Sequence, residues 1–135
     1  MVTPALEHAL ETEPLCYITT WDAKGKPGTV EIWFTWVDRK LYISTGGESL
    51  KVRKLRVTPR ARVTIGSRKG PWVEGPVRIL KDQATAERVA PAFLKKYKGK
   101  WETWKSTEDF VRRNVHEKSV LLECSVEKWA DGPHP

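Results

Sequence analysis

The chain has 135 residues, of which 39% are hydrophobic, as is typical of one folded domain with one modest core. No segment is long and apolar enough to span a bilayer, and residues 1–15 lack the pattern of a signal peptide, so we expect a cytoplasmic protein. The net charge of +7 predicts an anionic partner: nucleic acid, an acidic membrane surface or a phosphorylated small molecule.

The cysteines and histidines argue against a metal site. Cys16 and Cys124 lie in apolar runs, without CxxC spacing and without a neighbouring histidine, so we expect buried reduced thiols. The three histidines are scattered along the chain, and a histidine-based catalytic site is not predicted. The seven tryptophans indicate large flat contact surfaces, in the core, at a dimer interface or against a ligand.

Alternating hydrophobicity predicts six strands, at residues 15–21, 30–37, 41–45, 61–65, 72–80 and 119–129. Gly75, inside the fifth of these, indicates a bulge or a close backbone approach. Helices are predicted at residues 3–11, 49–57, 83–97 and 106–115. Thr3 and Ser106 can cap two of them, Glu48 or Ser49 can cap another, and Pro91 should kink or restart the third.

Short turns join most of these strands, whereas a doubly wound parallel sheet needs a helix between most strand pairs. We therefore predict a mainly β (α+β) fold, in which residues 1–135 form one domain. Its architecture would be a six-stranded antiparallel barrel, closed or nearly closed, with peripheral helices.

The segment 44–54 has the groups that a phosphate needs. A strand end passes through Gly46-Gly47 into a helix start, which offers free backbone N–H groups and the positive end of the helix dipole. Hydroxyls and cations accompany them: Ser44, Thr45, Ser49, Lys51, Arg53 and Lys54. The spacing is neither a Walker loop nor a dinucleotide-binding fingerprint. The alternative interpretation is a surface helix whose basic residues are only solvated.

Three pieces of the sequence, in order, carry a family resemblance. They are "TTWDAKGKPGTVEIWFTW", "RKLYISTGGESLKVRKLRVTPRARVTI" and "GPWVEGPVRIL", followed by the helical "KDQATAERVAPAFLKKY". Together they resemble the FMN-binding split-barrel family related to pyridoxamine 5′-phosphate oxidase, whose superfamily also includes enzymes dependent on the deazaflavin F420. The resemblance implies a split-barrel flavoprotein that transfers hydride or electrons to or from a small organic substrate.

The resemblance also implies roles for individual residues. Lys51 matches the lysine that binds the cofactor phosphate, with Ser49 beside it, and Ser44 and Thr45 match the strand-end pair near the phosphate and ribityl chain. The strand that lines the isoalloxazine ring matches Val30, Glu31, Ile32 and Trp33. In the family two subunits pair, and each cofactor lies at their interface, so a homodimer is expected.

Three departures argue against pyridoxamine 5′-phosphate oxidase activity itself. Leu50 stands where oxidases often have an arginine, Gly70 replaces a glutamine, and the C-terminal Arg-Leu-His-x-Arg motif is absent. FMN is the expected cofactor, with Arg53 and Lys54 compensating for the missing arginine. F420 is the alternative, because its phosphates and oligoglutamate tail also suit a basic groove.

The flavin ring carries the redox step in such proteins, so the sequence nominates no catalytic acid or base. Glu31 is the nearest carboxylate, for which an outward-facing salt bridge is the preferred interpretation; Trp101 and Trp104 either shape the substrate side or pack in an interface. Two other classes remain as alternatives: a small barrel that binds single-stranded nucleic acid, and a protein that binds a cofactor or haem without catalysis.

Overall fold

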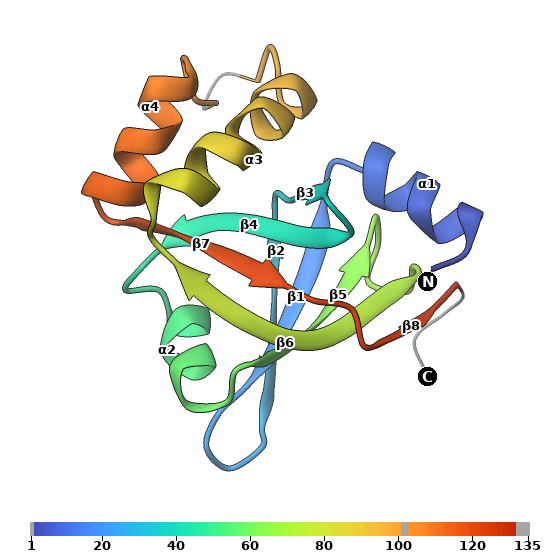
Figure 1. Cartoon of the computed structure of the whole chain (residues 1–135). Helices are drawn as coiled ribbons and strands as arrows, with labels where there is room; N and C mark the ends of the chain where they lie inside the picture. Colours follow the sequence, from blue (N-terminus) through green and yellow to red (C-terminus); the bar gives the residue numbers. More distant parts are fainter. Residues whose placement is uncertain (1, 101–102, 132–135) are drawn as a thin grey trace.

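Figure 1 shows the computed structural model, which describes residues 2–100 and 103–131. Its strands are β1 (Cys16–Trp21), β2 (Pro27–Ile32), β3 (Thr35–Val37), β4 (Lys40–Gly46), β5 (Arg60–Ile65), β6 (Trp72–Leu80), β7 (Ser119–Cys124) and β8 (Lys128–Ala130). They form one curled antiparallel sheet in the order β2-β1-β5-β6-β7-β4-β3, with β8 added to β6. This split barrel with peripheral helices confirms the predicted fold class. The number of strands differs from the expected six, because two predicted strands are each divided.

The predicted strand 30–37 is the first of these. It divides at Trp33–Phe34, so that β2 pairs with β1 and β3 pairs with β4. The Tyr97 hydroxyl supplies hydrogen bonds at the break: it accepts from the Phe34 backbone N–H at 2.9 Å. The same oxygen lies 2.9 Å from the Phe34 carbonyl oxygen and 2.7 Å from that of Pro14. A side chain from a distant helix therefore replaces the strand ladder at this point.

The predicted strand 119–129 divides into β7 and β8, both of which pair with β6. Ser125 donates its backbone N–H to the Pro76 carbonyl at 3.0 Å, and the chain then steps across to the other half of the sheet. A Cβ atom added to Gly75 would lie 2.0 Å from the Ser125 carbonyl oxygen. The close backbone approach predicted at Gly75 is thus confirmed.

The interior of the curled sheet holds one apolar core, and α1 (Pro4–Thr12) closes one end of it. The Thr3 side chain accepts a hydrogen bond from Leu6 N–H and so caps α1, as predicted. Leu6 and Leu10 are fully buried in this core. Cys16 and Cys124 lie in the same core as free thiols, which confirms that prediction.

A second apolar core lies on the outer side of β4 and β7, under a layer of helices (Figure 1). This helical layer consists of α3 (Gln83–Lys96), α4 (Thr107–Val111) and the π-helix Arg112–His116, named η1. Pro91 lies inside α3, which continues as one helix through it and does not restart. Tyr42 and Leu121 point from the sheet into this core, opposite Phe93 and Phe110.

The remaining helix, α2 (Leu50–Val57), follows the Gly46-Gly47 turn and packs on β1. Val52 and Leu55 are its buried residues, whereas Leu50 and Val57 are each 64% exposed. The Gly47 backbone N–H donates to the Lys118 carbonyl at 2.8 Å. The start of α2 is thereby held beside the segment that joins η1 to β7.

Candidate functional site

A cavity of about 420 Å³ lies where the break between β2 and β3 meets the helical layer. We call it the aromatic hollow. Its lining consists of Leu15, Glu31, Ile32, Trp33, Ser44, Trp104, Arg113 and Ser119. Four residues of the predicted site thus share one cavity: Glu31, Ile32, Trp33 and Ser44. Its floor is apolar, and hydroxyl, carboxylate and guanidinium groups stand around it.

Aromatic stacking fixes the floor of the hollow. The Trp33 ring lies parallel to the Tyr97 ring, with centroids 4.2 Å apart, and Trp104 meets Trp33 edge-on at 6.3 Å. Trp104 also contacts Phe93 and Phe110 in the second core. Stacked aromatic rings of this kind are held by both buried area and quadrupole geometry. Trp104 therefore packs against the core and lines the cavity at once, whereas Trp101 lies outside the described residues.

Val30 and Glu31, which were expected beside the ring, lie at the outer edge of the sheet. Val30 is 44% exposed and does not line the hollow. Glu31 accepts a hydrogen bond from the Tyr17 hydroxyl at 3.0 Å, which raises the pKa of that phenol. Glu31 forms no ion pair with any described residue, so the salt bridge preferred from the sequence is not what the structure has.

Ser44 and Thr45 point to opposite faces of β4, as neighbours in a strand must. The Ser44 hydroxyl faces the hollow and donates to Asn114 Oδ1 at 2.6 Å. Asn114 is completely buried in η1, where its amide also donates to the Phe110 carbonyl at 2.9 Å. Thr45 is buried on the barrel side with Ile43. Of these two hydroxyls, only that of Ser44 therefore lines the hollow.

The N-terminus of α2 has unsatisfied polar groups. Ser49 occupies the N-cap position, yet its hydroxyl makes no capping bond and is buried without a hydrogen-bond partner among the described residues. Lys51 is half-buried and forms no hydrogen bond or ion pair with any described residue, and burial lowers the pKa of its ammonium group. The first backbone N–H groups of a helix also lack partners within the helix. This set of donors fits an anion such as the phosphate of a flavin cofactor.

The other two cations of α2 point elsewhere. Arg53 is exposed to solvent. A Cβ atom on Gly28 would lie 2.6 Å from the Lys54 ammonium nitrogen, so Lys54 extends over β2. The predicted phosphate residues of α2 therefore do not all lie together. Arg53 faces solvent and Lys54 lies over β2, and neither of them lines the aromatic hollow.

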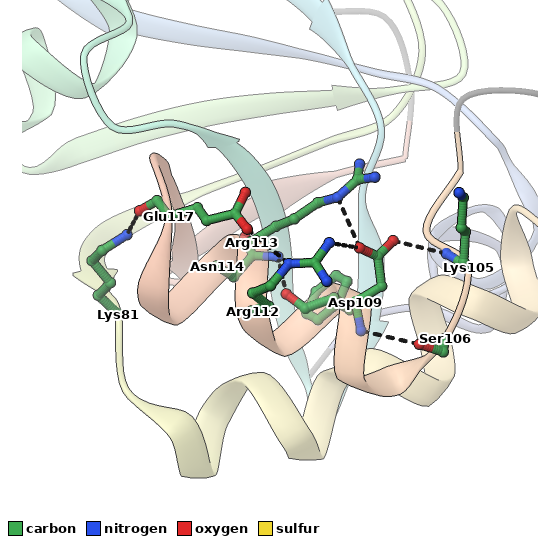
Figure 2. Close-up of polar contacts among 9 residues, drawn as sticks. Lys81, Lys105, Ser106, Asp109, Arg112, Arg113, Asn114 and Glu117 are labelled. Atoms are coloured by element: carbon green, nitrogen blue, oxygen red, sulfur yellow. Dashed lines mark hydrogen bonds and ion pairs between the residues drawn. The ribbon is translucent and has the colours of Figure 1, made fainter.

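An open groove of about 790 Å³ adjoins the hollow and shares Arg113 and Ser119 with it. The groove is lined by Arg112, Arg113, His116, Glu117, Lys118 and Ser119. Figure 2 shows this segment, with Asp109 of α4 contacting both arginines. Arg113 and Ser119 were not predicted as site residues from the sequence. The only signal for them was a basic pair just after the capping box at Ser106, which by itself specifies no site.

Two further properties concern the described residues, 2–100 and 103–131. Within these ranges no helix has both the length and the apolar character needed to cross a membrane. In the same part of the chain, histidine, cysteine and carboxylate side chains form no cluster that could hold a metal ion.

Comparison with solved structures finds the same fold in several proteins. A conserved hypothetical protein of Mycobacterium tuberculosis has a TM-score of 0.75 at 19% identity, covering 99% of this chain and 87% of its own. An F420 reductase has a TM-score of 0.71 at 17% identity, covering 96% and 98%. A FAD-binding protein of Mesorhizobium loti has a TM-score of 0.67 at 16% identity, covering 100% and 96%. At these identities the likeness concerns the fold.

The comparison with curated protein sequences found no match. The family model described as pyridoxamine 5′-phosphate oxidase, in contrast, matches residues 2–131, which is nearly the whole chain. That range contains all strands of the curled sheet, the aromatic hollow and the start of α2. The chain therefore belongs to the pyridoxamine 5′-phosphate oxidase family.

Proposed function

We propose that this protein is an oxidoreductase that binds a flavin-type cofactor and passes hydride or electrons between it and a small organic substrate. FMN is the first candidate for the cofactor, and F420 is the second. The observation that carries this proposal is the pair of unsatisfied groups at the start of α2, the buried Ser49 hydroxyl and the half-buried Lys51 ammonium.

The phosphate end of the cofactor would bind at Ser49 and Lys51. A buried hydroxyl without a partner costs free energy, and an acceptor oxygen from a ligand removes that cost. A phosphate beside Lys51 would also offset the partial desolvation of the ammonium group, raising its pKa toward the usual range. Phosphate binding at this site would therefore weaken as pH rises through the pKa of Lys51 in the free protein.

The ring end would lie along the end of β2, over the aromatic hollow. Trp33 and Ile32 offer an apolar surface there, and Ser44 offers an oxygen that can accept one further hydrogen bond. When bound, the flavin supplies the hydride or electron transfer. The protein's own part is to hold the ring, exclude water through Trp33 and Trp104 and leave one side of the hollow open to substrate.

A second copy of the chain would complete the site. Leu50 and Val57 present apolar side chains on the outer surface of α2, and Val30 does so on β2. A symmetric dimer that covers them would bury the surface on which the cofactor lies. Sedimentation velocity should show a dimer, and Leu50→Glu should shift it toward monomer.

The test of the cofactor assignment is a titration of the purified protein with FMN and, separately, with F420. Lys51→Ala should weaken binding of the cofactor by about 1–3 kcal/mol, the scale of a charge-assisted hydrogen bond. Arg56→Ala is the matched control, because it removes an exposed cation from the last turn of the same helix and should leave affinity unchanged.

Unchanged affinity in Lys51→Ala would refute the phosphate assignment, and failure of both cofactors to bind the wild-type protein would refute the proposed function. The visible absorbance of the purified protein separates the other classes. A colourless protein that binds oligonucleotides, with affinity falling steeply as salt rises, would be a nucleic-acid-binding barrel. A haem spectrum would identify a haem-binding protein.

A further inference from the structure

We infer that Arg113 and Lys118 bind an oxyanion, a carboxylate or phosphate, carried by the substrate that enters the aromatic hollow. This inference rests on the proposed function, since it assigns the substrate class to the same site. Its residues differ from those of the phosphate site at α2, which adjoins this segment through the hydrogen bond from Gly47 N–H to the Lys118 carbonyl. The residues that carry it belong to η1 and to the segment leading into β7.

Arg113 stands at the boundary between the two cavities and lines both. Its Nε donates to Asp109 Oδ1 at 3.2 Å, and its side chain is 39% exposed. In Figure 2 the two terminal nitrogens of its guanidinium point away from that carboxylate. They have no hydrogen-bond partner among the described residues. A guanidinium with two free, parallel N–H groups matches the geometry of a carboxylate or phosphate.

Asp109 orients this guanidinium. Its carboxylate is buried, with 7% of the side chain exposed, and accepts from the Lys105 backbone N–H at 3.0 Å. That hydrogen bond and the nearby charges of Arg112 and Arg113 lower the pKa of Asp109, so the carboxylate stays ionised. Arg112 binds Asp109 through Nη2 and Glu117 through Nε, the latter at 2.7 Å. The Arg113 guanidinium, in contrast, hydrogen-bonds to the described residues only through its Nε. Arg113 is therefore the arginine of this pair that remains available to a ligand.

The far wall of the groove is also held in place. The Lys81 ammonium group donates to the backbone carbonyls of Glu117 and Ser119 (Figure 2 shows the first), so the segment between η1 and β7 is tied to the end of β6. Lys118, between these two residues, is exposed and forms no hydrogen bond or ion pair through its side chain with any described residue. A second free cation therefore lines the same groove as Arg113.

The connection between the cavities indicates what the anion belongs to. An anion at Arg113 would lie at the rim of the hollow, next to Ser119 and within the cavity that Trp33 and Trp104 line. A molecule with an apolar or aromatic body and one acidic group would place the body over these rings and the acidic group in the groove. The substrate class is thus a small organic acid or a phosphorylated small molecule.

The experiment is a site-resolved NMR titration of the full chain with inorganic pyrophosphate. The Arg113 Nε–H and Ser119 backbone signals should shift and saturate. In Arg113→Gln and in Lys118→Gln, the affinity measured at Ser119 should fall at least about fivefold. Lys105→Gln, which removes a nearby cation outside both cavities, should leave that affinity unchanged. Lys118→Gln breaks no hydrogen bond or ion pair with the residues that the structure describes, so its result does not depend on Arg113→Gln folding.

The same variants are then titrated with FMN and with F420. Unchanged cofactor affinity together with weakened pyrophosphate binding assigns the groove to the substrate. A loss of cofactor affinity in Arg113→Gln would assign the anion to the cofactor and overturn the inference, as would pyrophosphate binding that is equal in wild type and both groove variants. If neither cofactor binds the wild type while pyrophosphate binding still depends on Arg113, the groove assignment stands and the flavin proposal fails.

Discussion

Replacing Tyr97 with phenylalanine should destabilise the protein by about 3 kcal/mol. The hydroxyl accepts from the buried Phe34 N–H and lies in donor range of two carbonyls, while burial raises the pKa of Tyr97 so that its proton is retained. Its loss leaves the Phe34 N–H unsatisfied, at about 1–3 kcal/mol, and removes one donated bond, at about 1 kcal/mol. The stacking on Trp33 is kept, so cavity formation adds nothing.

The assay is urea unfolding followed by tryptophan fluorescence, with an unchanged slope and a lowered midpoint. In a thermal melt the Tm should fall by about 10 °C for a chain of this size. Tyr17→Phe is the matched control: it also loses a hydroxyl, but one that donates to the exposed Glu31, and should cost less than about 1 kcal/mol. Equal losses of unfolding free energy in Tyr97→Phe and Tyr17→Phe would refute the idea that Tyr97 satisfies the backbone groups at the break between β2 and β3.

Two further predictions concern other positions. Gly75→Ala should cost about 3 kcal/mol or more in unfolding experiments, because its Cβ would collide with the Ser125 carbonyl, whereas Gly46→Ala has open space and should cost under about 1 kcal/mol. Lys96→Met should be more stable than wild type at pH 7, because burial lowers the pKa of Lys96 to about 8 and its ammonium has no hydrogen-bond partner in the described part of the chain. Because the unfolded state binds the proton of Lys96 more tightly than the folded state does, the free energy of unfolding of the wild type should rise between about pH 8 and pH 10.5. The stability difference between Lys96→Met and wild type should therefore narrow over the same range. A stability difference between the two proteins that stays constant with pH would contradict the lowered pKa of Lys96.

Much of the fold could be predicted from local pattern. Alternation placed the strands, and hydroxyl or carboxylate residues before apolar runs placed the helix starts, because both signals act over a few neighbouring residues. The division of residues 30–37 could not be predicted, because it depends on Tyr97, more than sixty residues away in sequence. The restart predicted at Pro91 does not occur for a related reason: the packing of α3 on the sheet keeps the helix continuous.

The candidate site, like the fold, could be predicted from the sequence only in part. Glu31 to Trp33 and Ser44 lie in strands whose pattern and family resemblance could be recognised. Asn114, which binds the Ser44 hydroxyl, and Arg113, which joins the two cavities, come from a π-helix with no sequence signature. Their roles depend on how the helical layer docks on β4 and β7, which is a tertiary property.

The separation of the two apolar cores has a consequence for how the protein opens. The barrel core and the core under the helical layer lie on opposite faces of β4 and β7. We therefore expect the helical layer to detach as one cooperative unit while the barrel stays folded. The hydroxyl of Tyr97, just after α3, hydrogen-bonds to the Pro14 and Phe34 carbonyls and so links the helical layer to the barrel. Native-state hydrogen exchange should find the amides of α3 and α4 opening together, at a lower free energy than those of β1 and β5. Such an opening would widen the hollow and admit a substrate without unfolding the sheet.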